Sequence, residues 1–180
     1  MLNVKIENVV SAARINGGLD LALAAERLRS AGHEARRSGR RFPGLTVRLK
    51  GIRTTFLLFS TGKVICTGAA SEEEALSAIK SLAAALRSLG VPCPADVKAE
   101  IANIVASANI GFRVDLERAA EGLRRAVYEP QEFPGVIYRM GDPRAAVLIF
   151  STGRIVCTGV KREEDVYTAV VNIAETLKRL

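Results

Sequence analysis

Two stretches of the chain place apolar side chains on both faces of predicted strands. They are FLLFSTGKVICTG, residues 56–68, and VLIFSTGRIVCTG, residues 147–159. Each stretch predicts two short strands joined by a Ser-Thr-Gly turn. Because side chains alternate along a strand, Leu57 and Phe59 face away from Phe56. Each hairpin therefore either needs cover on both faces or leaves one apolar face bare.

The rest of the pattern predicts helices for only one of these faces. Each half of the chain predicts an opening strand, a short helix beginning at an Asp, a strand after Phe-Pro-Gly and a closing amphipathic helix. These span residues 4–10, 20–28, 45–49 and 72–89 in the first half, and 100–105, 115–125, 136–140 and 163–180 in the second. Two helices cover one face of a mostly antiparallel sheet. The other face is expected to bind a partner or to be buried in a dimer.

The two halves are copies of one unit. When residues 42–73 are aligned with residues 133–164, fifteen of 32 positions are identical at an offset of 91. The opening strands, ENVVSA and ANIVAS, align at an offset of 95, so the first copy has four extra residues. We expect them in or near Ala31–Arg41. The repeat predicts two domains, residues 1–91 and 92–180, related by a pseudo-two-fold axis.

Charge and composition narrow the class of function. The net charge is +7, and residues 1–91 carry all of it, with 14 Lys and Arg against 7 Asp and Glu. A basic half favours a polyanionic partner such as nucleic acid, although a solvated arginine-rich surface explains it equally well. No apolar run is long enough to span a membrane, no secretion signal is visible, and three cysteines favour a reducing compartment. The sequence shows no paired carboxylates, Cys/His cluster or phosphate loop, so we expect no enzyme, metal or cofactor.

The duplicated motifs N-[VI]-V, F-P-G-[LV], L-[LI]-F-S-T-G-[KR] and [CV]-T-G resemble the TATA-box-binding protein family over essentially the whole chain. The short N-terminus and the Cys before Thr-Gly are similar to the archaeal branch. The resemblance implies a saddle-shaped α+β fold, with an antiparallel sheet of about ten strands and four helices on the convex face. It also implies a general initiation factor that binds and bends the TATA box in the minor groove. The factor would recruit transcription factor B and, through it, RNA polymerase.

The resemblance also implies roles for individual residues. The expected wedges between base steps are Phe42, Phe59, Phe133 and Phe150. The expected base-edge donors are Asn8, Asn103, Thr67 and Thr158. The expected apolar groove floor is Val10, Val105, Leu57, Leu148, Ile65 and Val156. The expected phosphate contacts are Arg48, Arg53, Lys63, Arg139, Arg144, Arg154 and Lys161. Each assignment has a purely structural alternative. The phenylalanines could be ordinary core residues, the asparagines could serve a turn or a strand edge, and the basic residues could be solvated surface charges.

The two copies differ in the loop before Phe-Pro-Gly, which the family calls the stirrup. The second stirrup, residues 128–132, is acidic. In the family, transcription factor B binds to an acidic stirrup of this kind. The resemblance therefore implies that Glu129 and Glu132 contact this protein. The first copy instead has HEARRSGRR, residues 33–41. Our hypothesis is that these arginines grip phosphate and help to set direction on the promoter.

Three further expectations follow from the resemblance. The protein is expected to be a monomer on DNA, and a homodimer of the free protein stays open. It is expected in the cytoplasm with the nucleoid, or in a nucleus only if the source is eukaryotic. The main alternative is a divergent paralogue that bends DNA or binds protein without productive polymerase recruitment.

Overall fold

The chain folds into two compact α+β units. The computed structural model describes residues 2–15, 17–37, 39 and 43–180. The N-terminal unit is Asn8–Ala102, and the C-terminal unit is Asn103–Leu180 together with the chain up to Glu7. The described residues form four helices and ten strands, and the strand pairs within each unit are antiparallel. The predicted α+β class is confirmed. The division at residues 91 and 92 concerns the sequence repeat and stays a prediction.

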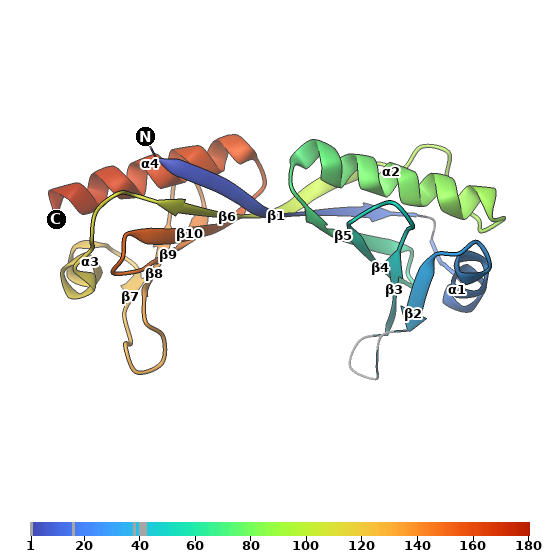
Figure 1. Cartoon of the computed structure of the whole chain (residues 1–180), viewed down its shortest axis with the longest axis horizontal. Coiled ribbons are helices and arrows are strands. Elements are labelled where there is room, and N and C mark those ends of the chain that lie inside the picture. The colour runs from blue at the N-terminus through green and yellow to red at the C-terminus, as the bar shows by residue number, and fades with distance from the viewer. Residues whose placement is uncertain (1, 16, 38, 40–42) are drawn as a thin grey trace. The chain divides into compact units, whose positions relative to one another are not determined.

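The N-terminal unit is a sheet with two helices on one side (Figure 1). Its strands follow the order β2-β3-β4-β5-β1. They are β1 (Asn3–Arg14, of which residues 8–14 belong to this unit), β2 (Glu34–Arg37), β3 (Gly44–Arg48), β4 (Thr55–Phe59) and β5 (Lys63–Ala69). Helix α1 (Leu21–Ser30) packs on β2 and β3, and α2 (Glu72–Ser88) packs on β5. The predicted hairpin is β4 and β5.

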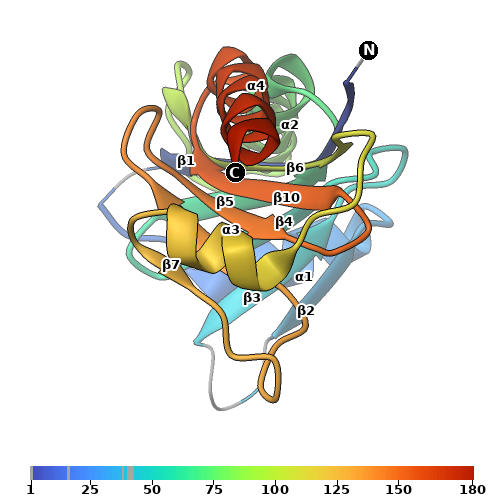
Figure 2. The same cartoon turned by 90° about the vertical axis from the view of Figure 1, so that its left-hand side faces the viewer.

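The C-terminal unit repeats this arrangement. Its strands follow the order β6-β10-β9-β8-β7. They are β6 (Ala99–Asn109, of which residues 103–109 belong here), β7 (Ala126–Val127), β8 (Val136–Met140), β9 (Ala145–Ile149) and β10 (Arg154–Val160). Helix α3 (Leu116–Gly122) packs on β7 and β8. Helix α4 (Glu163–Arg179) packs over β10 (Figure 2).

Local sequence signals explain where the helices begin. The Asp20 carboxylate accepts hydrogen bonds from the Ala22 and Leu23 amides at the start of α1. At α2 the Glu74 amide donates to Ser71 Oγ over 3.1 Å, and the Glu74 carboxylate accepts from the Ala70 amide. Ser71 followed by Glu74 three residues later is the sequence pattern of such a cap. The contacts to the Ala22, Leu23 and Glu74 amides satisfy donors that the first helical turn leaves without a backbone acceptor, and the contact to Ala70 holds the residue before the N-cap.

Each unit has its core between its helices and one face of its sheet. In the N-terminal unit Leu45, Phe56, Leu58 and Val64 are fully buried, and they pack in one cluster with α1 and α2. Burying a side chain of this size stabilises the fold by about 1.5–3 kcal/mol. The C-terminal unit buries a matching set: Val136, Val147, Ile149, Ile155, Val166, Val170 and Ile173. Cys66 and Cys157 are buried on the same faces.

The structure corrects two details of the predicted elements. Helix α3 ends at Gly122 rather than at residue 125, and β2 and β7 are edge strands that the hydrophobic pattern did not predict. The four extra residues lie near the start of the expected segment, Ala31–Arg41, and before its arginines. Ala35 pairs with Val47 as Ala126 pairs with Tyr138, so the offset is already 91 there. The extra residues therefore lengthen α1 and the turn after it.

Candidate nucleic-acid interface

Each unit leaves one face of its sheet without helices, and we call this the helix-free face. Its strand residues are half-exposed, and they alternate with the buried core positions. In the N-terminal unit they include Asn8, Val10, Leu57, Phe59, Ile65 and Thr67, and in the C-terminal unit Asn103, Val105, Leu148, Phe150, Val156 and Thr158. Cross-strand pairs such as Leu57 with Ile65, and Leu148 with Val156, make each face continuous. The predicted bare apolar surface is present in both units.

Two phenylalanines meet at the end of the helix-free face in the C-terminal unit. The rings of Phe133 and Phe150 pack edge to face, with centroids 5.7 Å apart, and both remain half-exposed. Gly135 makes this possible, because a Cβ there would lie 2.8 Å from the Ile149 carbonyl oxygen and 3.0 Å from Phe133. In the N-terminal unit Phe59 is half-exposed at the matching position, and Phe42 lies outside the described residues. None of the three described wedge candidates lies beneath a helix.

The two predicted base-edge asparagines have almost the same contacts in both units. Asn8 Oδ1 accepts the Gly68 amide at 2.7 Å, and Asn8 Nδ2 donates to Thr67 Oγ1 at 3.1 Å. In the C-terminal unit Asn103 Oδ1 accepts the Gly159 amide at 2.8 Å, and its Nδ2 donates to Thr158 Oγ1 at 3.1 Å. The glycine amide can only donate, so it fixes the orientation of each side-chain amide. Among the described residues the second N–H of each Nδ2 has no other acceptor.

The predicted phosphate contacts lie in different environments. Arg48, Lys63, Arg139, Arg144, Arg154 and Lys161 are exposed. Arg48 Nε donates to Thr55 Oγ1 at 3.1 Å. Arg53 differs from this set, because its Nε lies 3.0 Å from the Glu74 carboxylate at the start of α2. This ion pair holds the Arg53 guanidinium at the start of α2, so Arg53 is less free than the other six residues to contact a phosphate.

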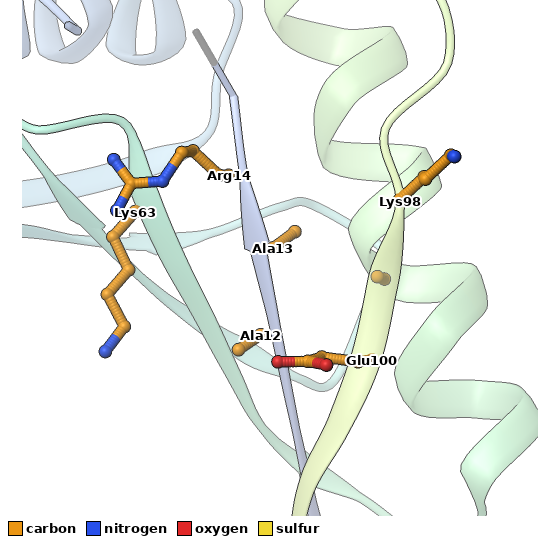
Figure 3. A pocket seen from close by; sticks show the side chains of 7 residues that line it. Ala12, Ala13, Arg14, Lys63, Lys98 and Glu100 are labelled. Carbon is orange, nitrogen blue, oxygen red and sulfur yellow. The ribbon is translucent and has the colours of Figure 1, made fainter. Parts of the chain in front are cut away.

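Sequence analysis missed two basic residues that lie near Lys63. A groove of about 390 Å³ in the N-terminal unit is lined by Arg14, Lys63, Lys98, Glu100 and three alanines. Arg14 pairs with Lys63 across β1 and β5, and its Nη1 donates to the Thr61 carbonyl. The basic side chains diverge, while Glu100 points across towards β1 (Figure 3). The groove is therefore no site for a small anion, although Arg14 extends the basic edge that Lys63 begins.

An acidic side chain of β1 also escaped the sequence analysis. Glu7 Oε1 accepts the Ser107 hydroxyl at 2.6 Å, and its Oε2 lies 3.0 Å from Lys5 Nζ within the C-terminal unit. The hydrogen bond from Ser107 and then the contact with Lys5 lower the pKa of the Glu7 carboxyl. Glu7 is therefore ionised at neutral pH, and Lys5 offsets part of its charge.

The acidic second stirrup forms a compact turn. The amides of Glu132 and Phe133 both donate to the Glu129 carbonyl oxygen at 2.9 Å. The turn therefore links the two predicted protein contacts, Glu129 and Glu132, directly to Phe133, a predicted wedge. Both glutamates are exposed. Beside them Tyr128, Pro130 and Pro134 line a groove of about 430 Å³ with the start of α3.

The part of the chain that the structure describes lacks two other features. It holds no group of three or more His, Cys, Asp or Glu residues that could bind a metal ion. None of its helices is both long enough and apolar enough to cross a membrane.

The chain consists of two copies of one α+β unit. The bare sheet face of each unit carries fixed amides between apolar side chains, which is typical of proteins that bind a ligand on the surface of a sheet. The family model described as "Transcription factor TFIID (or TATA-binding protein, TBP)" matches residues 3–89 and 98–180. The chain belongs to this family. It is 46% identical to the TATA-box-binding protein of Pyrobaculum aerophilum, over 98% of this chain and 86% of that protein. It is 40% identical to that of Methanothermobacter thermautotrophicus, over 99% of this chain and 95% of that protein.

A solved structure gives the same result for the fold. The structure described as Methanococcus jannaschii TBP superimposes with a TM-score of 0.86 and 39% sequence identity, covering 99% of each chain. Similarity at this level over the whole length supports the same strand order and helix placement in both proteins.

Proposed function

We propose that the chain is a general transcription initiation factor that binds and bends the A·T-rich TATA box through the minor groove. The observation that carries the proposal is the matched Asn-Thr-Gly set on the two helix-free faces. In each set the oxygen of the amide is occupied by a backbone N–H, so the amide presents a donor outward. The minor groove of an A·T pair presents only acceptors, adenine N3 and thymine O2.

The apolar residues around each amide account for the preference against G·C pairs. Val10, Leu57 and Ile65 in one unit, and their counterparts in the other, offer no acceptor to the guanine N2 amino group that a G·C pair adds to the minor groove. Burying that amino group without a partner costs about 1–3 kcal/mol. The preference for A·T over G·C pairs therefore comes from the missing hydrogen-bond acceptors of the helix-free face as much as from its amide donors.

The phenylalanines explain bending. Phe133 and Phe150 form one wedge, and Phe59 with Phe42 would form the other. Apolar wedges of this kind unstack base steps and kink the duplex towards the major groove, and TATA-binding proteins are themselves the standard example of the mechanism. Arg48, Lys63, Arg139, Arg144, Arg154 and Lys161 would neutralise phosphates on either side of the opened groove.

Partner recruitment belongs to the second stirrup. Glu129 and Glu132 are exposed beside a groove lined by Tyr128, Pro130 and Pro134, which suits a protein surface carrying basic and apolar side chains. We assign this surface to transcription factor B, which in turn brings RNA polymerase to the promoter. One protein molecule binds each box, because a second copy on the helix-free face would compete with DNA.

Fluorescence energy transfer across a doubly labelled A·T-rich duplex tests this function. Addition of the protein should shorten the distance between the ends of the duplex at one-to-one stoichiometry. Addition of transcription factor B should then give a larger complex that E129K/E132K cannot form. Bending without that ternary complex would instead identify a paralogue that binds DNA without recruiting polymerase. Failure to bend any A·T-rich duplex would refute the proposed function.

A further inference from the structure

The edge strand β2 adds one arginine to the helix-free face of the N-terminal unit. Arg36 pairs with Thr46, Thr46 with Leu57, Leu57 with Ile65, and Ile65 with Ala12. These residues form one cross-strand row, and its inner members are half-exposed. Because paired residues share a face, Arg36 lies at the outer end of that row. Its side chain is 83% exposed.

The neighbouring arginine lies on the other face of the same strand. Arg37 pairs with Leu45, a fully buried core residue, and follows Arg36 by one position. Ala35, which shares that face, is buried in the core cluster with α1. Arg37 is exposed at the helix-covered side of the edge. The two arginines thus have the same charge and the same strand but face in opposite directions.

The C-terminal unit has a different residue at the position of Arg36. Its matching row runs from Val127 through Ile137, Leu148 and Val156 to Ser107. Val127 is 50% exposed, one of the most exposed large apolar residues among those described. Arg125 precedes β7 with a left-handed φ of 67°, so it does not belong to this row. The helix-free face of the N-terminal unit therefore ends in a cation, Arg36, whereas that of the C-terminal unit ends in an apolar side chain, Val127.

We propose that Arg36 is a phosphate-contact residue that only the N-terminal unit possesses. The proposal rests on the minor-groove binding proposed above. The next row on this face contains Gly44 paired with Phe59, so Arg36 lies at the same end of the sheet as one wedge position, two strands and one row away from it. Phosphates at a kinked step are brought close to the protein, and an arginine there neutralises one of them. Glu34 lies 4.0 Å away and is itself 63% exposed, so it holds Arg36 only weakly.

This contact makes the two ends of the bound box unequal. The end under the N-terminal unit gains a charge-assisted contact with the backbone, whereas the end under the C-terminal unit meets Val127. The difference is read through phosphates, so it changes affinity and salt dependence without changing base preference. It would favour one orientation of the protein wherever only one flank of the box can accept the contact.

Salt titrations of the full chain and three variants test the proposal. The variants are R36A, R37A and R36K, and the probe is an A·T-rich duplex labelled at one end. Each neutralised phosphate changes the slope of log K against log[salt] by about 0.9. R36A should therefore lower the slope by about 0.9 and the affinity at 0.1 M salt by roughly five- to tenfold. R37A and R36K should keep the wild-type slope, and the melting temperatures should agree.

A second duplex locates the contact. When the flanking phosphates at both box ends are replaced by neutral methylphosphonates, wild type and R36A should bind equally. An equal loss in R36A and R37A would show a long-range charge effect and overturn the proposal. A wild-type slope for R36A would also overturn it, and if that variant still bent the duplex the proposed function would stand. Failure of the wild-type chain to prefer A·T-rich duplex would overturn both.

Discussion

The two units keep the same Asn-Thr-Gly set on their helix-free faces but differ in the polar residues of their covered faces. The Asn-Thr-Gly distances agree within 0.1 Å for the amide and hydroxyl contacts made by Asn8 and by Asn103. Behind the sheet the N-terminal unit buries Ser11 and Thr54, where the C-terminal unit buries Ala106 and Ala145. A core tolerates exchanges of side chains that keep its volume filled. The Asn-Thr-Gly geometry is therefore the part of each unit that contact with the same ligand requires.

Removing a wedge should have the largest effect on this duplicated surface. We expect F150A to bind an A·T-rich duplex with about 2–3 kcal/mol less affinity and to bend it less, because the unstacked step loses its apolar contact. F112A is the matched control, since the Phe112 ring packs near Lys178 instead. Fluorescence energy transfer measures both quantities. Equal losses in F112A and F150A would show a general folding defect and remove the wedge role from Phe150.

Removing one outward donor should cost less. N8D and N103D keep an oxygen for the glycine amide but replace the N–H donor with a second acceptor. Each should lose about 1–3 kcal/mol of affinity for an A·T-rich duplex, because carboxylate oxygens face the acceptors of the groove floor. Thermal melting of the free variants is the control for folding. If only one of the two variants loses affinity, the units do not read the groove in the same way.

Substitutions of the polar residues in the core of the N-terminal unit should change the stability of the chain but not its DNA binding. Thr54 Oγ1 is buried and has no hydrogen-bond partner among the described residues. T54V should therefore stabilise the chain by about 1 kcal/mol, because it removes an unsatisfied hydroxyl without opening a cavity. S11A should destabilise it by about 1 kcal/mol, since Ser11 Oγ donates to the Ala75 carbonyl at 2.9 Å. Denaturant unfolding measures both, and DNA affinity should be unchanged in each.

The cysteines give the smallest expected difference between the units. Burial raises the pKa of the Cys157 thiol to about 11, and it raises the pKa of the Cys66 thiol as well. A thiol with a raised folded pKa stabilises the fold fully below its unfolded pKa, and this stability is lost as the pH rises through the folded value. Unfolding free energies should therefore fall between about pH 8.5 and 11, and less so for C157A.

Thiol labelling checks the same environments at neutral pH. Cys93 is half-exposed, whereas Cys66 and Cys157 are buried. One thiol per chain should react quickly in the native protein, and the other two should react only after denaturation. Rapid labelling of C93A would contradict the burial of the two core cysteines.

Much of the fold could be predicted because the chain states its pattern twice. The two hairpins were predicted correctly, since they depend on local alternation and on the spacing of the turn residues. The edge strands β2 and β7 were missed. Glu-Ala-Arg-Arg carries no apolar alternation, and a strand of two residues is too short to show one. Both form because β3 and β8 offer them unpaired backbone groups, which is a property of the assembled sheet.

The candidate site was predictable in part for the same reason. Asn8, Phe59 and their counterparts stand at repeated positions, so a repeat alignment finds them. The pairing of Arg53 with Glu74 depends on the path of a loop past α2, and no sequence spacing records that path. Arg14 became visible only through its register opposite Lys63. Both contacts join segments that are far apart in the sequence, so neither could be predicted from local spacing.

Substitution of inosine for guanine tests the central claim most directly. An I·C pair lacks the N2 amino group, so its minor groove presents the acceptors of an A·T pair, while its major groove keeps the G·C pattern. A box in which every A·T pair is replaced by I·C should bind and bend almost as well as the original, whereas the G·C version should not. Loss of binding to the I·C box equal to that of the G·C box would show that the helix-free faces do not read the minor groove.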